Sequence, residues 1–106
     1  MESFSNVDPS RVQQLQSQEG AVLVDVRTDQ EVGRGIIPGA RHIPLHLLPQ
    51  RLAELGDAPV LIFYCQSGAR SAQACAFVSG SGDREIYNLA GGILAWAGRG
   101  LPLANI

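Results

Sequence analysis

The sequence of 106 residues contains no lysine and only two cysteines. Without lysine, mechanisms that use a lysine nucleophile or a Schiff base are excluded. Two cysteines are too few for a disulfide scaffold and cannot by themselves complete a structural zinc site, so neither a metal nor a cofactor is expected. We therefore expect free thiols and a reducing compartment, the cytoplasm.

Long apolar runs and a strong charge of one sign are also missing. No run of about 18 apolar residues occurs, so no membrane-spanning helix is expected. The first ten residues lack the basic start and apolar stretch of a secretory signal. A formal net charge of −2 disfavours nucleic-acid binding. The length and an apolar content of 45% indicate one domain over residues 1–106 with one core.

Short apolar runs alternate with amphipathic stretches, which predicts a parallel α/β sheet covered on both faces. Buried strands are expected at residues 21–26 and 60–64, a further strand at 85–89, and a weaker strand at 40–43. Asp8-Pro9 is typical of a helix start. Further helices are expected at 69–79, after Gly91-Gly92, and over the leucines of residues 45–55, with Pro49 in the first turn. Residues 80–83 predict a turn.

Cys65 follows the apolar run 60–64 and precedes a glycine-bearing loop and a predicted helix. Ligands bind beyond the carboxyl ends of parallel strands, so the candidate site lies in this loop and in the segment that follows Val26. Successive backbone N–H groups and a helix N-terminus favour an anion there and lower the pKa of a thiol below its free value of about 8.5. Gly68 permits a positive φ, Arg70 offers a permanent cation, and Ser71 is placed to brace the loop. A lone cysteine is usually buried and inert, but this combination favours a nucleophile.

The second cysteine, Cys75, is interpreted as a packing residue. It shares a helix face with Ala72, Ala76 and Ser79, and small residues there allow close packing on the sheet. About 10 Å of helix separates Cys75 from the helix start, at about 1.5 Å per residue. A disulfide requires Cα atoms within about 7 Å, so a bond to Cys65 is not expected.

Four segments of the chain resemble the rhodanese domain, a sulfurtransferase family. Residues 65–71 are similar to its active-site loop, and residues 24–27 with Glu31 to its first signature. Residues 35–44 resemble its Gly-His-Ile-Pro-Gly-Ala segment, and residues 88–96 its glycine–tryptophan segment. The four occur in the family's order over nearly the whole chain, which indicates a single-domain member.

The resemblance implies an α/β fold: a three-layer α/β/α rhodanese-like architecture around a mostly parallel five-stranded central sheet. It implies that Cys65 takes a sulfane sulfur from thiosulfate or a similar donor, becomes a persulfide, and passes the sulfur to a thiol or cyanide. The residues expected to bind substrate are Gln66, Ser67, Gly68, Ala69 and Arg70. Three further residues are expected to support the site: Ser71, Asp25 and Arg27. A protein-to-protein sulfur relay stays open as the alternative, with a protein as donor or acceptor. Neither nucleic acid nor a membrane is expected as a partner.

The sequence departs from the family pattern at two positions. Ile36 stands where the family has a histidine, and Val32 where an aromatic residue is frequent. Both positions look architectural, so we expect altered packing rather than altered chemistry. Cysteine-dependent phosphatases place five residues between cysteine and arginine, whereas four separate Cys65 from Arg70. Phosphatase or arsenate-reductase-like activity is therefore the less favoured alternative.

Several other residues are candidates with mainly structural interpretations. Asp25 and Arg27 lie at a strand end and are expected to form a structural ion pair, which is compatible with orienting the cysteine loop. His42 and His46 lie in a connecting segment and are assigned a surface or packing role. Gly91-Gly92 is interpreted as a tight turn that borders the site, and Trp96 as a core residue.

Overall fold

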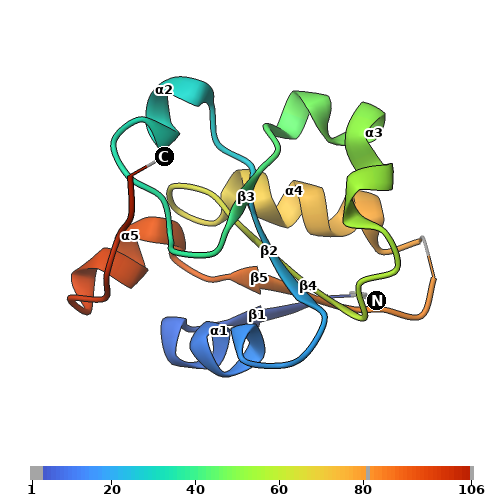
Figure 1. Ribbon diagram of the computed structural model, residues 1–106, viewed down its shortest axis with the longest axis horizontal. Helices are drawn as coiled ribbons and strands as arrows, with labels where there is room; N and C mark the ends of the chain where they lie inside the picture. The colour runs from blue at the N-terminus through green and yellow to red at the C-terminus, as the bar shows by residue number, and fades with distance from the viewer. Residues whose placement is uncertain (1–3, 81, 106) are drawn as a thin grey trace.

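A sheet of five strands crosses the centre of the computed structural model, which describes residues 4–80 and 82–105 (Figure 1). The strand order is β1-β5-β4-β2-β3, and all four pairings are parallel. The strands are β1 (Ser5–Val7), β2 (Ala21–Asp25), β3 (Arg41–His42), β4 (Val60–Tyr64) and β5 (Glu85–Leu89). β4 lies in the middle, so the loop that follows it emerges at the centre of the sheet's carboxyl edge.

Helices cover both faces of the sheet and complete three layers. The elements are α1 (Pro9–Gln16), α2 (Asp29–Val32), η1 (Leu45–Leu47), α3 (Leu48–Arg51), η2 (Leu52–Leu55), α4 (Ala69–Val78) and α5 (Gly92–Gly98). Figure 1 shows α3 and α4 on one side of the sheet and α1 and α5 on the other. The predicted α/β/α architecture is thereby confirmed.

The strand β4 explains why the core has two halves. All five of its residues are buried, and successive side chains point to opposite faces of a strand. Leu61 and Phe63 pack in the cluster that includes residues of α4, whereas Ile62 and Tyr64 pack in the cluster that includes residues of α1 and α5. Cys65 continues this alternation into the α4 side. The strand's pleat therefore decides on which face the loop begins.

Most of the expected elements are present, including the helix that begins after Asp8. The Asp8 side chain accepts a hydrogen bond from the Arg11 N–H, and Pro9 occupies the first turn. Two short elements were not anticipated: β1 at the sheet edge and α2 after β2. Three residues and four residues, respectively, give too little periodicity to be detected from sequence. Of the expected turn at residues 80–83, Ser81 lies outside the described residues.

The single helix expected over residues 45–55 is wrong. The segment divides into η1, α3 and η2, and only α3 is α-helical. Pro49 does lie in the first turn of α3, where its missing N–H is tolerated. At Arg51 the backbone leaves helical geometry, with φ −114° and ψ 14°. The leucine spacing allows Leu48 and Leu55 to be buried in the core although the segment is not one continuous helix.

The packing face expected for α4 is shifted. The buried residues are Ser71, Ala74, Cys75 and Val78, whereas Ala76 is exposed. Only Cys75 belongs both to these buried residues and to the packing face expected from the sequence. Placing Ser71 rather than Ala72 on the inner face turns its hydroxyl toward the start of the loop, which matters for the site.

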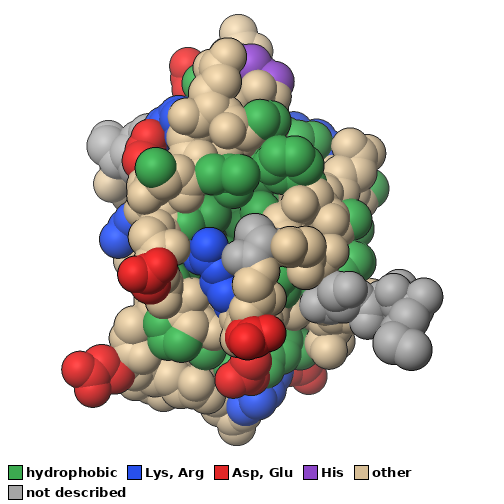
Figure 2. Space-filling view, turned by 90° about the vertical axis from the view of Figure 1, so that its right-hand side faces the viewer, with side chains coloured by type: hydrophobic (Ala, Val, Ile, Leu, Met, Phe, Trp, Pro, Cys, Tyr) green, Lys and Arg blue, Asp and Glu red, His purple; other side chains and the backbone are tan. Residues whose placement is uncertain are grey.

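The surface carries both signs of charge. Figure 2 shows apolar side chains gathered over the upper part of one face, with acidic and basic side chains interspersed below. No helix among the described residues is long and apolar enough to cross a membrane.

Candidate active site

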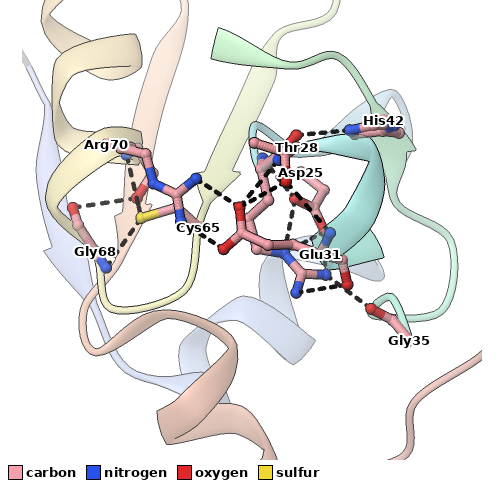
Figure 3. A network of polar contacts seen from close by, with 10 residues as sticks. Asp25, Thr28, Glu31, Gly35, His42, Cys65, Gly68 and Arg70 are labelled. Atoms are coloured by element: carbon pink, nitrogen blue, oxygen red, sulfur yellow. Dashed lines mark hydrogen bonds and ion pairs between the residues drawn. The ribbon is translucent and has the colours of Figure 1, made fainter. Parts of the chain in front are cut away.

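Cys65 is the first residue after β4 and lies at the mouth of a short loop that leads into α4 (Figure 3). The residue is 1% exposed, and its thiol is free. The loop turns sharply at Gly68, whose φ of 107° disfavours any residue with a Cβ. A Cβ there would also lie 3.4 Å from the Gly91 nitrogen. The thiol is thus held inside a tight turn rather than displayed on the surface.

Hydrogen-bond donors from the loop and the first turn of α4 surround the Cys65 sulfur. The Gly68 N–H donates to Sγ at 3.1 Å, and the Ser71 N–H donates at 3.4 Å. The Ser71 hydroxyl lies 3.4 Å from the same atom. Three donors on one sulfur form a cradle, and we use that name for residues 65–71. Such a ring of donors stabilises a negative sulfur in a site shielded from water.

These donors decide the ionisation of Cys65. Burial by itself raises the pKa of the thiol, because it penalises the charged form. Hydrogen bonds from the Ser71 hydroxyl and from the N–H groups of Ser71, Gly68 and Ser67 outweigh burial, and the net pKa lies below its usual value. The direction agrees with the expectation from the strand–loop–helix pattern.

The N-terminus of α5 holds the cradle from outside. The Ile93 N–H donates to the Cys65 carbonyl at 2.9 Å, and the Leu94 N–H donates to the Gln66 carbonyl at 3.2 Å. With these two carbonyls turned toward α5, the N–H groups of the loop are free to face the sulfur. Gly92 makes this approach possible, since a Cβ on it would lie 2.3 Å from the Gln66 carbonyl oxygen. The Gly91-Gly92 turn therefore borders the site as expected, and its role is close backbone packing.

Three other side chains of the loop are exposed at the surface. Gln66, Ser67 and Ala69 are exposed, so they contribute to the site through their backbone and their neutral surface. The pattern fits a small ligand that is held by N–H groups. None of the three side chains offers a charge.

Arg70 is engaged by a carboxylate. Its guanidinium forms two hydrogen bonds of 2.7 Å with the carboxylate of Glu31 on α2 (Figure 3). Two such bonds in parallel hold the guanidinium in one plane. Arg70 lowers the pKa of Glu31 to about 2, with further hydrogen bonds from Thr28. In this geometry Arg70 braces the cradle against α2. Glu31 is therefore a residue of the site, although the sequence identified it only as part of the first family signature.

Asp25 and Arg27 form a buried ion pair beside this brace. The Arg27 Nη2 lies 2.7 Å from the Asp25 carboxylate, and the two side chains are nearly inaccessible to solvent. Arg27 also donates to the carbonyls of Glu31 and Gly35. Among the described residues, no hydrogen bond joins this pair to the cradle directly. The pair fixes the segment that carries Glu31, which matches the structural interpretation.

Cys75 lies in the middle of α4 and is fully buried. Its sulfur donates to the Tyr87 carbonyl at 3.4 Å, and burial raises its pKa to about 12. Neither cysteine forms a disulfide. The interpretation of Cys75 as a packing residue is confirmed.

Asn88 on β5 is a site residue that the sequence did not reveal. It is 3% exposed and lies on the same face as the cradle. Its Oδ1 accepts from the Ser71 hydroxyl at 2.6 Å, and its Nδ2 donates to the Gly68 carbonyl at 3.2 Å. The available signals were a polar residue between Tyr87 and Leu89 of a predicted strand and its place at the start of the segment 88–96.

The histidines and Trp96 take structural positions. His42 contacts the Arg27 carbonyl at 2.7 Å, and the Trp96 indole donates to the Pro102 carbonyl from the core. His46 is exposed and lines a cavity of about 290 Å³ with Leu45, Arg70 and neighbouring residues. Across residues 4–80 and 82–105, no cluster of three or more His, Cys, Asp or Glu side chains is suited to hold a metal.

Taken atom by atom, the cradle supports one kind of chemistry. A thiolate at Cys65 is a strong nucleophile, and the same N–H groups that stabilise it can stabilise an anion formed on it. No carboxylate lies within the cradle to protonate a leaving group. A leaving group that departs as a stable anion therefore suits the site.

The chain matches the family model described as "Rhodanese-like domain" over residues 8–99. A "Sulfurtransferase" of Allochromatium vinosum is 46% identical over 91 residues, which cover 86% of this chain and 85% of that protein. A "Thiosulfate sulfurtransferase GlpE" of Ectopseudomonas mendocina is 39% identical over 97 residues, which cover 91% and 87%. The solved structure of a rhodanese-like domain protein from Staphylococcus aureus is similar, with a TM-score of 0.82, 27% identity, and coverage of 97% of this chain and 99% of that one.

Proposed function

This chain belongs to the rhodanese-like domain family, and on that basis we propose that it is a sulfurtransferase whose nucleophile is Cys65. The proposed donor is thiosulfate or a similar small anion that carries a sulfane sulfur, and the proposed acceptor is a thiol or cyanide. The similarity to proteins named thiosulfate sulfurtransferase supports this donor.

The proposed reaction has two steps. In the first, the Cys65 thiolate attacks the outer sulfur of thiosulfate, a new S–S bond forms, and the old S–S bond breaks with its electron pair leaving on sulfite. Cys65 then carries a persulfide with the negative charge on its terminal sulfur. In the second step, the acceptor attacks that sulfur, the persulfide bond breaks, and the Cys65 thiolate returns. Neither step needs a general acid, because sulfite and the thiolate both leave as anions.

The single observation that carries the proposal is the cradle around Cys65. Its N–H groups and the Ser71 hydroxyl lie within hydrogen-bond distance of the sulfur, and they lower the thiol pKa despite burial. The donors occupy positions from which a persulfide anion is also stabilised. A cysteine that served packing alone has no use for this arrangement, as Cys75 illustrates.

The test is to incubate the protein with thiosulfate and to measure intact mass for one added sulfur. Cyanide is then added and thiocyanate is quantified. We expect one sulfur on Cys65, absent in Cys65→Ser and retained in the matched variant Cys75→Ser. Turnover by Cys65→Ser would overturn the mechanism.

The same assay separates the alternatives. Loading of Cys65 by a cysteine desulfurase but by no small donor would replace the enzyme proposal with the sulfur relay. Robust hydrolysis of an aryl phosphate would support the phosphatase alternative instead. We also propose that the protein works in the cytoplasm, since a reactive thiol persists in a reducing compartment.

A further inference from the structure

The side chain of Asn88 connects the edge strand β1 to the cradle, although it does not touch the Cys65 sulfur through a hydrogen bond. Asn88 lies on β5, paired in register with Phe63 of β4 and with Asn6 of β1. It is one of four buried polar or charged residues among those described, the others being Asp25, Arg27 and Ser71. A buried amide is costly unless its donors and acceptor are all satisfied.

Each polar atom of Asn88 has a partner, and these partners fix the orientation of the amide. Nδ2 donates to the Asn6 Oδ1 at 2.9 Å and to the Gly68 carbonyl at 3.2 Å. Because both partners are acceptors, the nitrogen must lie on that side. The Oδ1 therefore faces Ser71, whose hydroxyl donates to it at 2.6 Å.

The two contacts toward α4 reach the groups that surround the sulfur. Gly68 is the N-cap of α4, and its N–H donates to Cys65 Sγ. Ser71 lies in the first turn and offers both its N–H and its hydroxyl. Gly68 has no side chain with which to cap α4, and Asn88 from the neighbouring strand supplies two side-chain hydrogen bonds that tie this turn to the sheet.

The Ser71 hydroxyl has one proton and three acceptors within reach: Asn88 Oδ1 at 2.6 Å, the Gly68 carbonyl at 3.2 Å and Cys65 Sγ at 3.4 Å. The shortest distance assigns the proton to Asn88 while the sulfur is neutral. A negative sulfur is the stronger acceptor, so the hydroxyl can turn to it without moving its oxygen. In that state the hydroxyl no longer donates to Asn88 Oδ1, and Asn88 holds the turn through its Nδ2, which donates to the Gly68 carbonyl.

We propose that Asn88 is a positioning residue for the sulfur chemistry: it pins Gly68 and Ser71 to the sheet so that their donors face Cys65 Sγ. This inference rests on the proposed function for its purpose and on the hydrogen bonds for its geometry. The charged and titratable groups that act on Cys65 or its neighbours are Arg70 of α4, Glu31 of α2, Asp25 of β2 and Cys75 of α4. None of them is hydrogen-bonded to Asn88 in the described structure, so replacing Asn88 removes no hydrogen bond to a charged group.

The test compares the wild type with Ser71→Ala, Asn88→Ala and the double variant. The thiolate of Cys65 is followed by its ultraviolet absorbance during a pH titration, with Cys65→Ser as the blank. Cys75, with a pKa raised to about 12, stays protonated over the range that matters. This readout needs no sulfur donor, so it stands even if thiosulfate proves to be the wrong substrate. Conversely, persulfide formation can succeed while this inference fails.

We expect Asn88→Ala to reduce the thiolate fraction at neutral pH by about fivefold, a loss typical of one weakened hydrogen bond to a charged group. In the double variant the reduction should be smaller than the product of the two single reductions, because both changes act on the same turn. An unchanged thiolate fraction in Asn88→Ala, or independent effects in the double variant, would overturn the proposal.

The matched control is Asn6→Ala, which removes a different hydrogen bond of the same Asn88 amide. It should leave the thiolate fraction within about twofold of wild type, since the contacts to Gly68 and Ser71 remain. An equal loss in Asn6→Ala would mean that general loosening of the sheet edge explains the result. If Asn88→Ala does not fold, Asn88→Thr takes its place, because a β-branched residue suits the strand and still removes the amide N–H.

Discussion

Cys65 and Cys75 are ten positions apart, and both are buried in the same half of the core. The pKa values of their thiols are nevertheless shifted in opposite directions. At Cys65 the pKa is lowered, and at Cys75 it is raised to about 12. Burial opposes ionisation at both. The difference arises because Cys65 lies where a strand ends and N–H groups are still unpaired, whereas Cys75 lies inside a helix whose N–H groups are already used. The pKa of each thiol is therefore set by the hydrogen-bond donors that face its sulfur, not by exposure.

Gly92→Ala should reduce the difference between the Cys65 and Cys75 thiols more than any other change. A Cβ at residue 92 would lie 2.3 Å from the Gln66 carbonyl oxygen and 2.5 Å from that of Cys65, and φ is +60°. The cradle must shift, so we expect sulfur transfer to fall by about 100-fold or more, as is typical when catalytic groups move by about 1 Å.

Gly98→Ala is the control for that change, because Gly98 lies in the same helix with open space around it and no positive φ. It should leave sulfur transfer unchanged and stabilise the protein by up to about 1 kcal/mol. Steady-state kinetics and thermal unfolding measure both. Wild-type kinetics in Gly92→Ala would refute the close-packing role of α5.

Ser71→Ala should make Cys65 more like Cys75. It removes one donor from the sulfur, and a hydrogen bond to a charged group contributes about 1.5–3 kcal/mol. We expect the pKa of Cys65 to rise and kcat/KM at neutral pH to fall about tenfold. The deficit should shrink as pH is raised above the new pKa, which a pH–rate profile reveals. A uniform loss at every pH would assign Ser71 a role other than thiolate stabilisation.

Arg70→Ala tests whether a cation adds to the neutral donors. Arg70 is about one-third exposed and is already paired with Glu31. We expect the KM for thiosulfate to rise by about threefold to tenfold, because a screened cation near the site contributes about 1 kcal/mol to binding. An unchanged KM would reduce Arg70 to a brace for the loop.

Glu31→Gln should give the smallest effect of these changes, and we expect that effect in the free energy of unfolding. The pKa of Glu31 is lowered from 4.5 to about 2, so its contribution is complete above about pH 4.5 and is lost as pH falls toward 2. Because the pair is partly exposed, we expect it to stabilise the fold by about 0.5–1 kcal/mol near neutral pH. Denaturant unfolding at pH 6 and pH 3 should show that the wild type loses more stability than Glu31→Gln. Equal losses would show that the ion pair is energetically silent.

Much of this comparison was visible in the sequence. The apolar run of β4, the glycine at position 68 and the arginine at position 70 placed a thiol at a strand end before a helix, and the spacing from Cys65 to Cys75 excluded a disulfide. These features are local, and local geometry follows from residue type. The broken helix at 45–55 and the shifted face of α4 were mispredicted because small residues and leucines satisfy more than one helical register.

A parallel α/β fold with Cys65 at its carboxyl edge can be predicted from the residues alone, because hydrophobic periodicity and turn residues act over a few positions. The contacts that reach the loop from other elements follow from the folded arrangement: the N–H groups of Ile93 and Leu94 on the loop carbonyls, Glu31 on Arg70, and Asn88 on Ser71. Glu31 is 39 positions from Arg70 in the sequence, and Asn88 is 17 positions from Ser71. No local sequence pattern therefore encodes these two side-chain contacts. They meet because parallel strands deliver distant loops to one edge of the sheet.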